Sequence, residues 1–191
     1  TAGGRVFNAT SANGFLYMLE QLPVQSGTRF PMVLNLVCRS VSGPLDIHGD
    51  HSDLYFGLNT GWPILLARDP QAVYDMNIMA IKLAEHPEVR LPVIVASDGY
   101  FTSHQKRRVM TFAKREDVLK FIGERPPQGF PDVLDRNNPI TVGPYMNEPD
   151  YINNCYQQSM AMYRAGEVYD QIRKEYAELT GRDYPILDLY R

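Results

Sequence analysis

The sequence predicts an α/β fold in which a parallel sheet carries helices on both faces, and three observations support this prediction. Short apolar runs of strand length alternate with segments of helical periodicity. The apolar runs are nearly continuous, as in strands that are buried on both faces. Clusters of polar residues follow the ends of these runs, which is where open α/β sheets commonly build ligand sites.

Four apolar runs have the length and composition of strands: residues 6–9, 33–38, 64–67 and 91–96. A first helix is expected over residues 15–21, after a short polar turn. A second helix is expected to start at Pro70, because proline suits the first helical position, and to end before Pro87. Strand, polar turn and helix in this order are the parts of βαβ units.

The character of the sequence changes after residue 104. A short helix is expected over residues 115–124, followed by a proline-rich connector over residues 126–149. A long helix is expected over residues 150–180, with Gly181 as its C-cap. A seven-residue periodicity marks one stripe of this helix, which could bind a partner or dock on the chain's own sheet. The stripe contains Cys155, Met162, Ala165, Tyr169, Ile172, Tyr176 and Leu179.

We therefore divide the chain into three regions. Residues 1–104 are expected to form a partial α/β domain. Residues 105–149 form the proline-rich connector region, which includes the short helix expected over residues 115–124. Residues 150–191 form a long helix with an extended tail. The helix and tail are expected to pack on the domain or on a partner. Because the chain starts only a few residues before a strand, we expect the N-terminal part of the domain to be missing.

The composition limits the classes of partner and cofactor. The net charge of −3 over 191 residues shows no basic excess that would suggest nucleic acid. No apolar run approaches the roughly 20 residues that span a bilayer, and no signal pattern opens the chain, so a cytoplasmic protein without a membrane partner is expected. Cys38 and Cys155 are too few to ligate an iron–sulfur cluster, and Cys38 is expected to be a buried thiol in a reducing compartment.

Arg39 is the first candidate functional residue, because it is a single charge at the end of the apolar run 33–38. Its guanidinium presents a fork of donors that suits a carboxylate and stays charged at any working pH. Two interpretations remain open from the spacing: a clamp for a ligand carboxylate, or half of a structural ion pair.

The loop after Arg39 is dense in histidine and aspartate: His48, Asp50, His51 and Asp53. Imidazole and carboxylate suit several divalent metals, but no third histidine lies nearby, so a metal-dependent hydrolase is only an alternative. The dipeptide Gly49-Asp50 begins like a Gly-Asp-Gly thiamine diphosphate signature. His51 replaces the second glycine and would obstruct the approach of a diphosphate to the backbone.

Two further polar groups have both an ordinary and a functional interpretation. Thr10 and Ser11 could cap the helix that follows them or could contact a ligand. Ser103, His104 and Asp98 contain the residue types of a hydrolytic triad, but the chain has no Gly-x-Ser-x-Gly motif to place a nucleophile. Only geometry identifies a triad, so the sequence alone gives little support to this one.

In the order and spacing of its motifs, the chain resembles the α-chain of 2-oxoacid:ferredoxin oxidoreductases of the pyruvate type. The resemblance covers nearly all residues, and no single piece is decisive. The matching pieces are Ala9-Thr10-Ser11 with Gly14, Arg39-Ser40, Gly49-Asp50-His51-Ser52-Asp53, Thr60-Gly61-Trp62, Leu91-Pro92-Val93, Asp98-Gly99-Tyr100, Thr102-Ser103-His104, Asn138-Pro139 to Gly143-Pro144, Tyr156-Gln157-Gln158, Thr180-Gly181-Arg182-Asp183-Tyr184 and Tyr190-Arg191.

The resemblance implies a thiamine diphosphate enzyme in which this domain packs against the aminopyrimidine ring. A partner chain of the β type would bind the diphosphate with Mg²⁺, and another would hold iron–sulfur clusters. Such enzymes cleave a 2-oxoacid, pass electrons to ferredoxin or a similar acceptor, and transfer the acyl group to coenzyme A. No iron–sulfur cluster or metal ion is expected to be ligated by this chain.

The resemblance also implies roles for individual residues. Arg39 would hold the substrate carboxylate, and Thr10, Ser11 and Asn13 would lie near the pyrimidine side of the cofactor. The loop residues His51 and Asp53 would line the active-site entrance or a subunit contact. These assignments apply to the positions that match the motifs quoted above.

The chain departs from the family pattern in three respects. The glutamate that activates the aminopyrimidine in this family precedes the equivalent of Thr1, so the chain is not expected to be active alone. Leu58 stands where pyruvate enzymes usually carry arginine, and Asn13 where they usually carry glutamine. These differences leave the choice of 2-oxoacid open, although the Gly-Asp-His-Ser-Asp string favours pyruvate. A non-catalytic assembly subunit of such a complex is the alternative.

Overall fold

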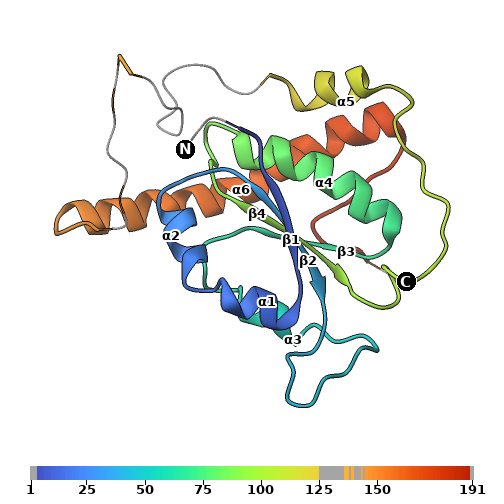
Figure 1. Cartoon of the computed structure of the whole chain (residues 1–191). Helices are drawn as coiled ribbons and strands as arrows, with labels where there is room; N and C mark the ends of the chain where they lie inside the picture. Colours follow the sequence, from blue (N-terminus) through green and yellow to red (C-terminus); the bar gives the residue numbers. More distant parts are fainter. Residues whose placement is uncertain (1–3, 125–135, 138, 140–142, 144, 190–191) are drawn as a thin grey trace.

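The computed structural model describes residues 4–124, 136–137, 139, 143 and 145–189. Its strands form one parallel sheet in the order β1-β2-β4-β3 (Figure 1), so the predicted α/β class is confirmed. Within these residues, no helix combines the length and apolar composition that crossing a membrane requires. In chain order the elements are β1 (Phe7–Thr10), α1 (Ala12–Tyr17), α2 (Gln21–Gly27), β2 (Val33–Cys38), α3 (Ser52–Tyr55), β3 (Ile64–Ala67), α4 (Pro70–Glu85), β4 (Val93–Asp98), α5 (Arg115–Ile122) and α6 (Asp150–Thr180).

The two central strands bury side chains on both faces of the sheet, as continuous apolar runs predict. On one face, Val33 and Val93 belong to a core that α4 and α6 complete. On the other face, Leu34 and Ile94 belong to a second core with Phe15 and the α1–α2 region. The sheet is therefore a middle layer between two sets of helices (Figure 1).

The region after β1 differs from the single helix predicted over residues 15–21. The chain instead forms α1 and α2, joined by turns in which the amides of Met18 and Leu19 bond three residues back. Pro23 explains the break, because proline has no N–H to donate within a continuing helix but is tolerated in a first turn. The signal for α2 was therefore present in the sequence as Pro23.

Helix α4 begins as predicted, because Asp69 caps it and Pro70 occupies its first turn. The Asp69 carboxylate accepts a hydrogen bond of 2.8 Å from the amide of Ala72. The bounds of β2 and β3 are those predicted, whereas β1, β4 and the end of α5 differ from the prediction by one or two residues. Helix α3 is an additional short helix within the predicted polar loop. Most of the predicted connector over residues 126–149 lies outside the described residues.

Helix α6 extends over residues 150–180 as predicted and ends at Gly181, whose φ of +72° suits glycine. Its predicted stripe mostly docks on the chain's own core against α4: Ala165, Tyr169, Ile172 and Tyr176 are buried. The two ends of the stripe differ, since Leu179 is exposed and Cys155 is only half-buried.

A buried carboxylate fixes α6 and the following segment to α4. Asp75 of α4 is fully buried and accepts hydrogen bonds from Tyr176 and Tyr184. The guanidinium of Arg182 binds it with two nitrogens, at 2.6 and 2.9 Å. Because three side chains satisfy this carboxylate with four hydrogen bonds, the cluster determines where the end of α6 and Tyr184 lie.

We expect the substitution Asp75→Asn to destabilise the fold by about 3–5 kcal/mol, because it leaves the partly buried Arg182 without its counter-charge. The measurement is urea unfolding of the polypeptide that carries this chain. The matched control is Asp170→Asn, which weakens two partly exposed pairs within α6, with Arg173 and Lys174, and is expected to change the midpoint little. Equal effects of the two substitutions would contradict the assignment.

The same cluster predicts an acid-sensitive component of stability. Burial raises the pKa of Asp75, but the hydrogen bonds from Arg182, Tyr176 and Tyr184 outweigh burial and leave the pKa below its ordinary value. The stabilisation is therefore fully present above the unfolded pKa of about 4 and is lost as the pH falls through the folded pKa. Unfolding free energies measured from pH 6 downward should show a shallower decline for Asp75→Asn than for the parent.

Candidate active site at the carboxyl edge of the sheet

The parallel strands bring several polar loops to one edge of the sheet. The strand order places the end of β2 between the ends of β1 and β4 (Figure 1). Ser11 follows β1, Arg39 follows β2, and Gly99 follows β4. Residues that are far apart in the sequence therefore meet at this edge, as the positions of the polar clusters predicted.

Arg39 lies half-buried at the centre of this edge. Its Nε atom is buried and has no hydrogen-bond partner among the described residues, and its guanidinium forms no ion pair within them. A buried donor without an acceptor is costly, so such groups generally have a partner. The structural ion pair, one of the two interpretations of Arg39, is thus not formed in the described part of the chain.

The loop after β1 carries the three residues expected near the cofactor. Ser11 occupies the N-cap position of α1, but its side chain makes no capping hydrogen bond. The Thr10 hydroxyl lies where a side chain on Gly14 would be 2.7 Å from it, which explains the glycine at that position. Asn13 is exposed, and its amide oxygen accepts a hydrogen bond of 3.1 Å from the backbone of Ser42.

Asp53 joins the loop after β1 to the end of β2. The family resemblance implies that Asp53, like His51, lines the active-site entrance or a subunit contact, and the structure of this chain buries the Asp53 carboxylate completely. Its Oδ2 atom accepts hydrogen bonds from the amides of Ala12, at 2.8 Å, and Arg39, at 3.1 Å. Sequence reasoning missed this role, because nothing local indicates which amides a loop aspartate will reach.

The ends of β2 and β4 approach closely at Gly99. Its amide donates a hydrogen bond of 2.9 Å to the carbonyl of Cys38, and a Cβ atom on Gly99 would overlap that carbonyl oxygen. Cys38 is buried as predicted. Burial, together with the nearby Asp53 carboxylate, raises the pKa of its thiol to about 12, so the thiol is protonated and unreactive at neutral pH.

The histidines gather around the loop after β4 instead of forming a metal site. The Nε2 atom of His51 lies 3.7 Å from Asp98 Oδ2, while His48 packs edge-on against Tyr100. Among the described residues, no group of three or more histidine, cysteine, aspartate or glutamate side chains could hold a metal ion. Because Asp53 also faces backbone amides, this geometry does not favour the metal-dependent hydrolase.

The suspected triad is not assembled either. Ser103 Oγ lies 2.8 Å from His104 Nδ1, but the serine hydroxyl donates to the Gly99 carbonyl. Asp98, the third residue, accepts hydrogen bonds from the amides of Tyr100 and Phe101 through Oδ1. Its second oxygen faces His51 rather than His104, so the catalytic relay that a triad needs is missing.

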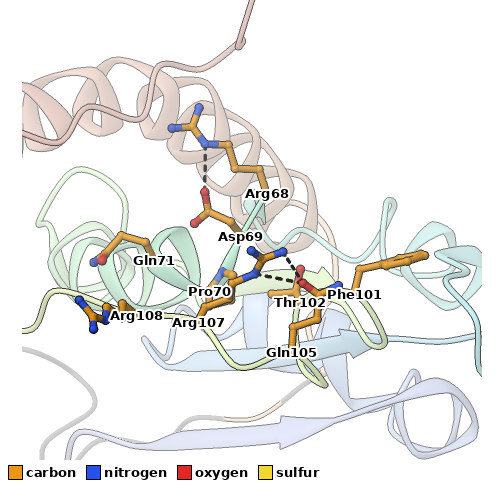
Figure 2. Close-up of a pocket in the computed structure, with 9 residues that line it drawn as sticks. All are labelled: Arg68, Asp69, Pro70, Gln71, Phe101, Thr102, Gln105, Arg107 and Arg108. Atoms are coloured by element: carbon orange, nitrogen blue, oxygen red, sulfur yellow. Dashed lines mark hydrogen bonds and ion pairs between the residues drawn. The ribbon is translucent and has the colours of Figure 1, made fainter.

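A cavity of about 540 Å³ lies at the other end of the same edge, between the start of α4 and the loop after β4. Figure 2 shows that its three arginines do not converge on one point. Arg68 turns to Asp69, Arg107 turns to the amide oxygen of Gln105, and Arg108 points away from both. This cavity therefore offers a weaker ligand site than the edge around Arg39.

Comparison with known proteins identifies the family of the chain. The sequence model of the family described as pyruvate flavodoxin/ferredoxin oxidoreductase, thiamine diphosphate-binding, matches residues 1–174. The chain belongs to this family. The match covers both the sheet and most of α6, so the family assignment applies to the whole described fold.

Relatives within the family carry subunit names. The chain is 42% identical over 190 residues to the pyruvate synthase subunit PorA of Thermotoga maritima, covering all of this chain and 48% of the relative. It is 35% identical over 182 residues to the ketoisovalerate oxidoreductase subunit VorA of Pyrococcus horikoshii, covering 95% of this chain and 45% of the relative. The chain thus spans about half the length of the curated relatives it matches.

Several residues that carry the family resemblance have structural roles. Gly61 has a φ of +79°. A Cβ atom there would overlap the side-chain amide nitrogen of Gln158 and lie 2.8 Å from the Ser26 hydroxyl. Gln158 in turn binds Ser26 at 2.8 Å, joining α6 to α2. The Trp62 indole donates to the carbonyl of Leu22. These motif residues therefore hold the helices around the site and need not touch a ligand.

Gly99→Ala is expected to destabilise the fold by about 1–3 kcal/mol, because the added methyl group would force the ends of β2 and β4 apart. Gly166→Ala in α6 is the control, since a Cβ there meets no atom within 4 Å. It should stabilise the helix by roughly 0.5–1 kcal/mol. Both values come from urea unfolding, and a Gly99→Ala variant as stable as the parent would show that the two strand ends separate without cost.

Proposed function

We propose that this chain is the α-chain portion of a thiamine diphosphate-dependent 2-oxoacid:ferredoxin oxidoreductase, with pyruvate as its 2-oxoacid. Family membership and the names of the relatives support the reaction class. The reaction converts the 2-oxoacid and coenzyme A into acyl-coenzyme A and carbon dioxide, and passes two electrons to ferredoxin. Pyruvate is chosen because the relative at 42% identity is a pyruvate synthase subunit.

The site assignment rests on one observation, which is that the Arg39 guanidinium lacks an acceptor within the described residues. Its guanidinium is half-buried at the carboxyl edge of the sheet, and its buried Nε lacks an acceptor within the described residues. A 2-oxoacid carboxylate suits the planar fork of an arginine, because two parallel hydrogen bonds can form. We therefore assign Arg39 as the group that binds the substrate carboxylate. The unpaired state also argues against the purely structural assembly subunit.

The residues of this chain fit the pyrimidine side of thiamine diphosphate better than its diphosphate side. The Gly49-Asp50-His51 string does not provide the Gly-Asp-Gly cradle, and the described residues hold no group of three metal ligands. Thr10, Ser11 and Asn13 would lie near the aminopyrimidine. The chemistry that the cofactor supplies when bound is stabilisation of the carbanion that decarboxylation leaves.

Other chains would complete the enzyme. We assign the diphosphate and Mg²⁺ to a β-type partner chain, and the iron–sulfur clusters to a further partner. Two cysteines, one of them buried, do not suffice for cluster ligation here. His51 would lie at the active-site entrance or a subunit contact, which agrees with its partly exposed side chain. The assembled complex would work in the cytoplasm.

Replacing Arg39 by alanine in the assembled complex is expected to raise KM for the 2-oxoacid at least 30-fold. The loss of one charge-assisted carboxylate pair corresponds to about 2–5 kcal/mol. Arg39→Lys keeps the charge but not the fork, so its KM should lie between those of the parent and Arg39→Ala. The measurement is steady-state kinetics with the 2-oxoacid as the varied substrate.

Arg164→Ala serves as the control, because it removes an exposed arginine of α6 that pairs only with Glu167 among the described residues. Its KM should equal that of the parent complex. If Arg39→Ala leaves KM for the 2-oxoacid unchanged, Arg39 does not bind the substrate carboxylate. In that case the alternative of an assembly subunit gains support.

A further inference from the structure

The carboxylate of Asp53 is buried without a cationic partner among the described residues. The side chain is inaccessible to solvent, three backbone amides donate hydrogen bonds to it, and the Cys38 thiol also lies within hydrogen-bonding reach. Oδ2 accepts from Ala12 and Arg39, and Oδ1 accepts from Leu54 at 2.9 Å. A buried carboxylate is tolerated only where donors satisfy it, so the three amides are held in fixed positions around it.

One of these amides belongs to a backbone position that is unfavourable for its residue. Ala12 has a φ of +42°, which lies in a region of backbone conformation that residues other than glycine rarely adopt. The hydrogen bond of 2.8 Å from its amide to Asp53 offsets part of this cost. The path of the loop after β1, which carries Ser11 and Asn13, therefore depends on Asp53.

The second amide belongs to Arg39 itself. The same Oδ2 atom accepts both hydrogen bonds, so the backbone of Arg39 and the loop after β1 share one anchor. Arg39 lies just beyond the last hydrogen-bonded residue of β2, and the sheet alone does not fix its orientation. Asp53 lies in α3 and its own neighbour Leu54 packs on the second core, which makes the anchor rigid.

We propose that Asp53 is a positioning residue, which orients Arg39 toward the substrate and fixes it relative to the loop after β1. This inference rests on the proposed function, because it assumes that Arg39 binds the 2-oxoacid carboxylate. Asp53 itself contacts neither substrate nor cofactor in this assignment. It acts through the backbone of Arg39, since misplacing a guanidinium by a fraction of an ångström weakens two hydrogen bonds at once.

Asp53→Asn tests the proposal in the assembled complex, because it keeps the shape of the side chain and turns one acceptor into a donor. The expected result is an increase of about tenfold in KM for the 2-oxoacid, equivalent to about 1.4 kcal/mol. KM for coenzyme A should change less than twofold. Asp50→Asn is the matched control in the same loop: its remaining oxygen can still accept from the amide of Ser52, so KM should be unchanged.

A double-mutant cycle separates positioning from a general structural role. If Asp53 acts through Arg39, Asp53→Asn has no further effect on KM in the Arg39→Ala background. Additive effects, or an unchanged KM in Asp53→Asn, would overturn the proposal. An unchanged KM in Arg39→Ala would instead overturn the proposed function, so the two failures are distinguishable.

Two further variants allow the proposal to be tested even if Asp53→Asn prevents folding or assembly. Ala12→Gly removes the strain of the positive φ, so in the Asp53→Asn background it should recover assembly without restoring KM. If Asp53→Asn still does not assemble, the same cycle is run with Asp53→Glu, which keeps the charge and displaces the oxygens by one methylene group. Additivity of Asp53→Glu with Arg39→Ala would likewise overturn the proposal.

Discussion

A fully buried carboxylate, that of Asp53, accepts backbone hydrogen bonds from the loop after β1 and from the residue that follows β2. The parallel sheet brings these two strand ends to the same edge, but parallel pairing alone leaves the loops free to take many paths. A buried carboxylate must be satisfied by hydrogen bonds, so only those loop conformations that place the amides of Ala12 and Arg39 against Asp53 are compatible with this fold. The backbone of Arg39 and the loop after β1 are therefore both anchored to the Asp53 carboxylate.

The described residues contain a second fully buried carboxylate, that of Asp75, and the two are satisfied in different ways. Asp75 is bound by the Arg182 guanidinium and two tyrosine hydroxyls, and it fixes the end of α6 on α4. Asp53 has backbone amides as its donors and fixes loops at the candidate site. The side-chain donors of Asp75 thus hold two helices together, whereas the amide donors of Asp53 fix the course of the backbone in the loops.

The proposed division of the site among several chains agrees with the residues that this chain holds. At one edge of the sheet it holds a set of small polar residues and Arg39, which has no counter-ion in the part of the chain that the structure describes. Among its described residues, no cluster of metal ligands accompanies them. The relatives are named as subunits and are about twice as long as this chain, which agrees with chemistry shared among several polypeptide segments.

The sequence by itself determined the four strands, α4 with its proline start and α6 with its glycine end, because periodicity and the residues at helix ends are local signals. It also placed Arg39 at a strand end. The tertiary structure alone decided the burial of Asp53, the close approach at Gly99 and the docking of α6 on α4. These features depend on contacts between residues that lie far apart in the chain, and no local pattern encodes them.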